Sequence, residues 1–134
     1  MSLGKLQFSH AERRVKIDFN SDVLCILDGQ YGFGQTIGEQ AVRLGLDKAA
    51  TSGAAVVALN NAGHLGRIGD WAEMAAAEGM IGMVWAGGFG EEQPATVPYG
   101  GRKPVLHTNP IAIGFPGGDE SPMMLSLIHI SEPT

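Results

Sequence analysis

Alternating apolar and polar positions predict strands near the start of the chain. Val15, Ile17 and Phe19 alternate with polar residues, and the apolar run 23–27 follows a turn-forming Asn-Ser-Asp sequence. Asp28-Gly29 is a further turn signal. We therefore expect one or two short strands within residues 15–27, closed by a turn.

Two helices are predicted from apolar residues at helical spacing. Each has an acceptor side chain with a glutamate three residues later at its start, and a glycine at its end. These signals are Thr36 with Glu39 and Gly53 for the first helix, and Asp70 with Glu73 and Gly79 for the second. We expect the helices to end near Ala50 and Ala77.

Short apolar runs predict three further strands, at residues 54–59, 81–85 and 111–115, the first two of them buried. A long loop rich in glycine and proline covers 87–103. The order of strands and helices predicts the α/β class, in which helices are layered on a sheet.

Composition and charge exclude several classes of function. The 134 residues carry a net charge of -5 and no basic stripe, so binding driven by nucleic-acid phosphates is not expected. The apolar runs are shorter than the ~18 residues that a membrane span needs, and the start lacks a secretory pattern, which favours the cytoplasm.

The single cysteine excludes an internal disulfide and a cysteine-built zinc site, and we expect no metal site. Cys25 lies inside an apolar run and is interpreted as a core residue. Trp71, Trp85, Met74 and Met80 are also interpreted as core residues.

The segment 60–70 is the most informative for chemistry. It follows a predicted strand and precedes a predicted helix, which is where open α/β sheets often hold ligands. His64 lies among glycines at intervals of three, including Gly66, and is either an acid/base or a structural hydrogen-bonding group. Arg67 either binds an anionic group or pairs with Asp70.

The glycines at 32, 34 and 38 offer two readings. A dinucleotide fingerprint would use them to wrap a phosphate, but no acidic residue follows at the end of a second strand. A helix-entry turn is the better interpretation. Thr108 and Asn109, with Pro110 fixing the start of a strand, either hold a loop turn or present polar groups to a ligand.

Three blocks in a fixed order resemble one family. GFGQ at 32–35 is followed by NNAGHLGRIGDWAE at 60–73, and then by YGG at 99–101 with TNPIAIGFP at 108–116. Together they resemble the malate/L-lactate dehydrogenase type 2 family, and GRIGDWAE is most similar to its hydroxycarboxylate dehydrogenase branch. The resemblance implies the family's layered α/β fold, which binds NAD or NADP without a Rossmann domain, and a homodimer. It also implies hydride transfer between the cofactor and a small 2-hydroxy or 2-oxo acid.

The resemblance also implies roles for individual residues. His64 matches the family's histidine, which takes the hydroxyl proton during oxidation and returns it during reduction. The substrate- and cofactor-binding positions that it implies are Asn61, Gly66, Arg67, Thr108, Asn109 and Pro110.

Several positions depart from the family's pattern. Asn60-Asn61-Ala62 stands where the family has Arg-Asn-Ser, Gly87 and Gly88 stand where it often has Asn and Ser, and His107 replaces a glycine. These departures leave open which 2-hydroxy acid is the substrate. The choice between NAD and NADP is open as well.

Family chains are much longer, with a Ser-His-Gly motif upstream and Asp-x-Ala-Thr-Ser downstream. We expect residues 1–124 to be a partial dehydrogenase domain that is inactive alone. Residues 125–134 read LSLIHISEPT and look like a translated sequencing adapter. The alternative is a small non-catalytic ligand-binding or interaction domain.

Overall fold

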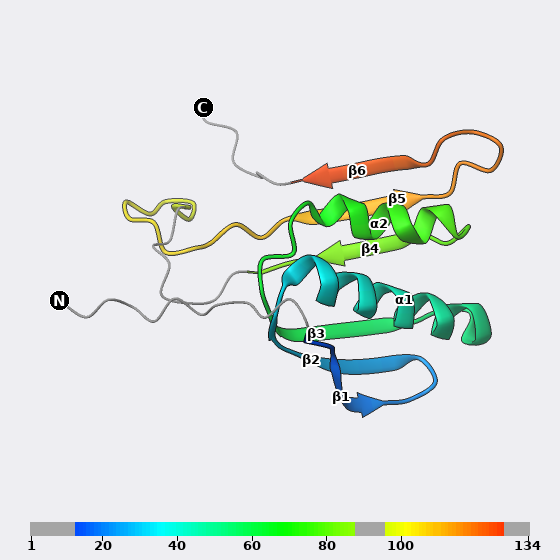
Figure 1. The fold of residues 1–134 in the computed structure, drawn as a ribbon. Helices are drawn as coiled ribbons and strands as arrows, with labels where there is room; N and C mark the ends of the chain where they lie inside the picture. The colour runs from blue at the N-terminus through cyan, green and yellow to red at the C-terminus, as the bar shows by residue number, and fades with distance from the viewer. Residues whose placement is uncertain (1–12, 88–95, 128–134) are drawn as a thin grey trace. The chain divides into compact units, whose positions relative to one another are not determined.

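The computed structural model describes residues 13–87 and 96–127. The described residues form two compact units, the first ending at Arg67 and the second starting at Ile68, and each is described by itself (Figure 1). Gly88 and residues 128–134 of the predicted adapter-derived tail lie outside the described residues.

Unit 1 is a three-stranded sheet with one helix. Its elements are β1 (Lys16–Asn20), β2 (Leu24–Gly32), α1 (Gly34–Ser52) and β3 (Val56–Ala62). The strand order is β1-β2-β3, with β1 antiparallel to β2 and β2 parallel to β3. A parallel pair needs a crossover, and α1 supplies it, so β2, α1 and β3 form a βαβ unit.

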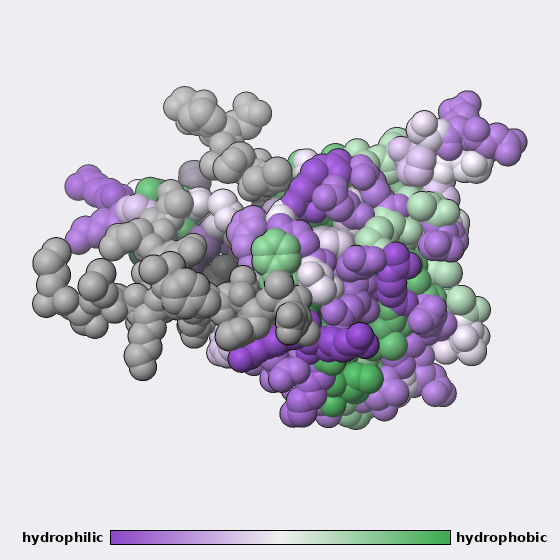
Figure 2. Space-filling model, in the orientation of Figure 1, coloured by the Kyte–Doolittle hydropathy of each residue, from purple (hydrophilic) through white to green (hydrophobic). Residues whose placement is uncertain are grey.

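The core of unit 1 lies between the sheet and α1. Cys25 and Leu27 are fully buried beside Ala41, and Leu59 packs against them, so the interpretation of Cys25 as core is confirmed. The prediction of a buried strand at 54–59 is wrong, because residues along β3 alternate between exposed and half-buried. Val56 is 64% exposed, since α1 covers only one face of the sheet. Figure 2 shows apolar surface over the region of β1 as well.

Helix α1 ends where the sequence predicts and begins earlier. The N–H of Gly53 donates to the carbonyl of Ala49 at 2.8 Å, and Gly53 has φ 81°, a left-handed value that glycine adopts without strain. The predicted capping box is wrong: the N-cap residue is Phe33, whose side chain cannot cap, and Thr36 lies inside the helix.

Unit 2 is an antiparallel sheet with one helix. Its elements are α2 (Ile68–Ala77), β4 (Gly82–Trp85), β5 (Ile111–Phe115) and β6 (Met123–Leu127), and the strand order is β4-β5-β6. The prediction for β5 is confirmed at both ends. β5 is not the last strand, because residues 123–127 pair with it as β6. With helices layered on sheets in both units, the α/β class is confirmed.

Helix α2 also has a well-formed C-terminus. Gly79 has φ 74°, its N–H donates to Ala76 O at 3.1 Å, and the N–H of Met80 donates to Ala75 O at 3.0 Å. These two bonds form the Schellman arrangement that the terminal glycine predicts. The predicted N-terminal cap at Asp70 is wrong, because α2 begins two residues earlier, at Ile68.

Only one face of the second sheet is covered by its helix. Trp71 is buried on α2, which confirms its core assignment, whereas Trp85 on β4 is 63% exposed, so that core assignment is wrong. Met74 and Met80 are half-buried. The prediction that 81–85 is buried fails for the same reason as for β3: successive residues of β4 point to opposite faces, and one face is open.

The segment before β5 is extended, with one local turn. Thr96 forms an isolated antiparallel bridge with Leu106, and the N–H of Gly101 donates to Pro98 O at 2.8 Å. This is consistent with the predicted loop, of which residues 88–95 lie outside the described part of the chain.

Candidate functional site

The candidate site of unit 1 lies where the parallel strands β2 and β3 end. Asp28 is in register with Asn60, and after an irregularity Gly32 is in register with Ala62. The carboxyl ends of the two strands are therefore neighbours. Segments that follow such ends are the usual place for ligand-binding groups in parallel sheets.

Asp28 connects these two strand ends. Its Oδ1 accepts a hydrogen bond from the Gln30 backbone N–H at 2.8 Å and another from Asn61 Nδ2 at 3.0 Å. The bond from Gln30, and then that from Asn61, lowers the pKa of the Asp28 carboxyl below its ordinary value of 3.8, with smaller contributions from the charges of Lys16 and Arg13. The carboxylate is therefore ionised at neutral pH.

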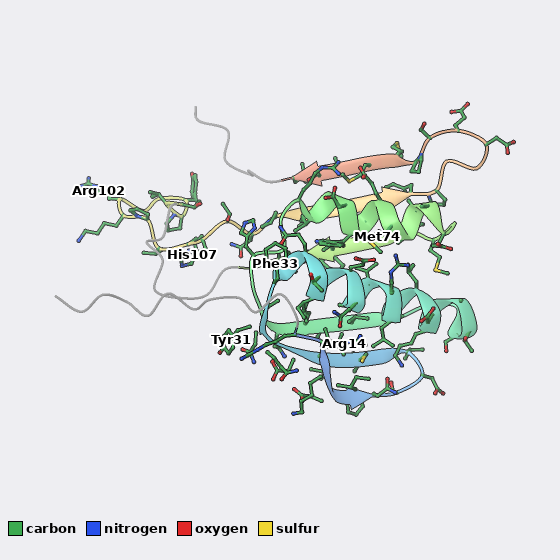
Figure 3. The ribbon with its side chains drawn as sticks, viewed as in Figure 1. Arg14, Tyr31, Phe33, Met74, Arg102 and His107 are labelled. Atoms are coloured by element: carbon green, nitrogen blue, oxygen red, sulfur yellow. The ribbon has the colours of Figure 1, made fainter. Side chains whose placement is uncertain are left out.

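The backbone at the strand ends is unusual. Gln30, Tyr31 and Asn61 have φ values of 51°, 56° and 51°, in the left-handed region that non-glycine residues seldom adopt. Figure 3 shows Tyr31 projecting outward at the end of β2. The predicted turn at Asp28-Gly29 is wrong, because β2 continues through an irregularity to Gly32.

The loop after β3 packs tightly on the start of α1. The N–H of Gly63 donates to Gly32 O at 3.0 Å. A Cβ atom at Gly34 would lie 2.0 Å from His64 O and 2.6 Å from Gly63 O, so only glycine fits there. A Cβ at Gly32 would lie 2.7 Å from an Ile37 side-chain carbon. The glycines at 32 and 34 are thus used for packing within the chain, which supports the helix-entry turn and argues against the dinucleotide fingerprint.

His64 is exposed and its ring is fixed by one hydrogen bond. Its Nδ1 accepts from the backbone N–H of Gly66 at 3.0 Å. Since Nδ1 acts as an acceptor, a neutral ring in this arrangement carries its proton on Nε2. Gly66 has φ 72°, a conformation that suits glycine. Nε2 is therefore the ring atom available for exchange with a ligand.

The other predicted residues fall into two groups. Asn61, His64, Gly66 and Arg67 lie together on the end of β3 and the loop after it, where Arg67 is exposed. Thr108, Asn109 and Pro110 lie in unit 2 and lead directly into β5. Each group therefore lies on one stretch of chain within a single unit.

In unit 2, Asn109 is held by the chain around it. Its Nδ2 donates to His107 O at 2.9 Å, which orients the amide, and a Cβ at Gly87 would lie 3.4 Å from its Oδ1. The N–H of Ala86 donates to Pro110 O at 3.2 Å and ties this segment to the end of β4. Thr108 and Asn109 are exposed, and Figure 3 shows His107 on the extended stretch before β5.

The sequence does not predict the roles that three residues have in this site: Asp28, Gln30 and Gly34. Asp28 carried a usable signal, because a carboxylate directly follows an apolar strand core. Gly34 is part of the glycine pattern at 32, 34 and 38, which does not by itself predict its contact with the His64 loop. The sequence does not indicate the role of Gln30, because this role depends on a backbone conformation that no motif predicts.

Among residues 13–87 and 96–127, no cluster of three or more His, Cys, Asp or Glu side chains is suited to a metal ion. In the same residues no helix has both the length and the apolar character needed to cross a bilayer.

The geometry can be compared with known proteins. The family model for malate/L-lactate dehydrogenase matches residues 5–127. Hydroxycarboxylate dehydrogenase B of Escherichia coli is 39% identical over 124 residues, which cover 92% of this chain and 33% of that protein. The chain therefore spans about a third of the length of such relatives.

Solved structures agree with the sequence comparison. The sulfolactate dehydrogenase of Methanocaldococcus jannaschii matches with a TM-score of 0.77 and 37% identity, over 85% of this chain and 32% of that one. The malate dehydrogenase of Pyrococcus horikoshii also matches with a TM-score of 0.77, at 33% identity, over 85% of this chain and 31% of that one.

Proposed function

Because the chain belongs to the malate/L-lactate dehydrogenase family, we propose that it is one part of a longer NAD(P)-dependent oxidoreductase. The complete enzyme transfers a hydride between the nicotinamide and C2 of a small 2-hydroxy or 2-oxo acid. The observation that carries the proposal is the exposed His64, with its ring oriented by Gly66 at the carboxyl ends of two parallel strands. Malate and sulfolactate, named in the relatives, are both 2-hydroxy acids, which supports this substrate class.

His64 exchanges the proton of the substrate oxygen through Nε2. In reduction the oxygen on C2 gains a proton as hydride arrives at the carbon, and in oxidation it loses one. A positioned acid/base that moves this proton contributes roughly 10²–10⁴-fold in rate. A doubly protonated ring carries hydrogen on Nδ1 as well, so it loses the bond from Gly66. The two protonation states of His64 therefore differ by one hydrogen bond to the loop.

The nicotinamide cofactor supplies or accepts the hydride at C4. The polar groups exposed before β5 fit its carboxamide, because the hydroxyl of Thr108 both donates and accepts and the oriented amide of Asn109 presents an oxygen acceptor. Pro110 fixes the path into β5. Asn61, Gly66 and Arg67 lie near His64 in the sequence of unit 1, where the guanidinium of Arg67 suits a substrate carboxylate. Either NAD or NADP is compatible with these groups.

We further propose that the complete enzyme is a cytoplasmic homodimer whose ligands are small molecules. The family resemblance supports the dimer. The net charge of -5 supports the view that neither nucleic acid nor an anionic membrane surface is a partner.

The test compares this 134-residue chain with the full product of its gene. Oxidation of NADH and NADPH is followed with a panel of 2-oxo acids, including oxaloacetate, pyruvate and sulfopyruvate. We expect turnover only in the longer protein, and a decrease in kcat of about 10²-fold or more in its His64→Gln variant. A His64→Gln variant as active as the parent would refute the role of His64.

The gene itself provides a second test. Extending the genomic sequence should reveal Ser-His-Gly upstream and Asp-x-Ala-Thr-Ser downstream. Stop codons close to both ends, together with no turnover, would instead favour a small non-catalytic ligand-binding or interaction domain.

A further inference from the structure

We propose that Asp28 is a positioning residue that fixes the loop carrying His64 by holding the side chain of Asn61. The inference rests on the proposed role of His64, although the arrangement of hydrogen bonds can be tested without substrate.

Asp28 lies between two strand ends. One oxygen, Oδ1, accepts from Gln30 N on its own strand and from Asn61 Nδ2 on the neighbouring strand. The contact with Asn61 joins residues 33 positions apart in sequence. Hydrogen bonds to an ionised acceptor are stronger than neutral ones, and the lowered pKa of Asp28 means that the carboxylate is the form present at neutral pH.

The residues bonded to Asp28 have strained backbones. Gln30 and Asn61 both have left-handed φ values, and Tyr31 has one as well. Such conformations persist only where the surroundings hold them, and they concentrate at functional sites. Gln30 is also fixed on its other side, because its Nε2 donates to Arg14 O at 2.8 Å and its carbonyl accepts from the Arg13 guanidinium. Asp28 supplies the matching restraint for Asn61.

The path along the chain from Asn61 to His64 is short. Two residues beyond Asn61, the N–H of Gly63 is bonded to Gly32 O, and the next residue is His64. The His64 carbonyl lies against the Cα of Gly34, and its ring accepts from Gly66. A change in the backbone at Asn61 therefore moves the start of the His64 loop. The other contacts of this loop, made by Gly63, His64 and Gly66, follow within a few residues.

The charged groups around Asp28 do not compete for this role. Lys16 and Arg13 contribute only the smallest of the effects that lower its pKa. Lys16 makes its own ion pair with Asp18 at 3.0 Å, on the exposed strand β1. Asp18 therefore provides a matched control, as an aspartate of the same unit without a contact to the loop.

The experiment measures the His64 ring and the Gly66 amide by NMR in this chain. Ring nitrogen shifts report which nitrogen carries the proton, and hydrogen exchange reports whether the Gly66 N–H is bonded. The wild-type chain should show the proton on Nε2 and a protected Gly66 amide. Asp28→Ala should give a mixture of tautomers and about 10-fold faster exchange at Gly66, corresponding to one lost hydrogen bond. Asp28→Asn keeps an oxygen that accepts both bonds, and should restore the wild-type signals.

A second variant keeps the test decisive if Asp28→Ala does not fold. Asn61→Gly removes the amide held by Asp28 and relaxes the left-handed backbone, so the fold should persist while the His64 loop is loosened. Asp18→Ala should leave His64 and Gly66 unchanged. Wild-type tautomer and exchange in Asn61→Gly or in Asp28→Ala would overturn the inference. The proposed function fails separately, through the activity of the His64→Gln enzyme.

In the complete enzyme, kcat and KM of the same variants distinguish a residue that positions His64 from one that binds the cofactor. Asp28→Ala should lower kcat about 10-fold or more and leave KM for the cofactor nearly unchanged, since a misplaced His64 impairs proton transfer. Asp28→Asn should recover most of kcat. A drop in kcat shared equally by Asp18→Ala would contradict the role of Asp28.

Discussion

Replacing Gly34 by alanine tests the closest backbone contact at the candidate site. The added Cβ would lie 2.0 Å from His64 O, 2.4 Å from His64 C and 2.6 Å from Gly63 O. All three are backbone atoms, so no side-chain rotation can relieve the overlap. Either the first turn of α1 or the His64 loop must move by about 1 Å, in an interior packed too densely to absorb such a shift freely.

The magnitude follows from what overpacking costs elsewhere. Extra methyl groups in well-packed sites destabilise by about 1–3 kcal/mol, and we expect Gly34→Ala to reach the upper end, about 3 kcal/mol. Gly45→Ala in the same helix is the matched control, because its Cβ meets only a Val57 methyl group at 3.1 Å. Alanine there also gains up to about 1 kcal/mol of helix propensity, so the net change should be near zero or stabilising.

Urea unfolding, followed by the amide signals of α1, gives both changes in the free energy of unfolding. A Gly34→Ala chain within about 0.5 kcal/mol of the wild type would refute the steric argument, because the loop would then be free to move. A Gly45→Ala chain destabilised as much as Gly34→Ala would show that the helix, rather than the contact, determines the effect.

Three further outcomes follow from the structure. Because the folded-state pKa of Asp28 is lowered, its ionised carboxylate adds stability that is complete above the ordinary value of 3.8 and is lost as the pH falls below that value through the folded-state pKa. Lowering the pH through this range should therefore reduce the free energy of unfolding more in the wild type than in Asp28→Asn. Acrylamide should quench the fluorescence of the exposed Trp85 in a Trp71→Phe chain much more than that of the buried Trp71 in a Trp85→Phe chain. In the complete enzyme, His64→Asn should lower kcat by roughly 10²-fold or more, measured by NADH oxidation, and equal rates would contradict the assigned role.

The ends of both helices could be predicted because their signals are local. A glycine with a left-handed φ terminates α1 at Gly53 and α2 near Gly79. The starts could not be predicted, because the sequence offers side-chain caps at Thr36 and Asp70 that the helices pass by. At α1 the start depends on Gly34 packing against a loop about 30 residues away.

Burial was predicted less well than element position. The apolar runs of β3 and β4 correctly indicate strands, but such runs do not show whether both faces of a sheet are covered. One helix lies on each sheet, so Val56 and Trp85 on the opposite faces remain exposed. Assigning core residues requires knowing which faces of each sheet are covered by other elements. The sequence pattern predicts only where the strands lie.

The sequence identifies His64 and its glycines as a candidate site. It does not identify the contacts that hold them in place. Spacing along the chain is enough to place His64 after a strand. The bond from Asn61 to Asp28 depends on β2 and β3 being parallel and in register at Asp28 and Asn60. Such a pairing between distant segments follows from tertiary structure, and no local motif encodes it.

The close approach of α2 to its sheet has an evolutionary consequence. A Cβ at Gly82 would lie 2.6 Å from the Ala75 methyl group, and one at Gly114 would lie 2.5 Å from the Ala72 carbonyl. Helix and sheet thus meet through alanine and glycine, the two smallest residues. In descendant sequences, a glycine at position 75 would remove only part of the obstacle at Gly82, because the Ala72 carbonyl oxygen also lies 2.9 Å from the added Cβ. Both Gly82 and Gly114 are therefore constrained by the main chain of α2, which no substitution removes.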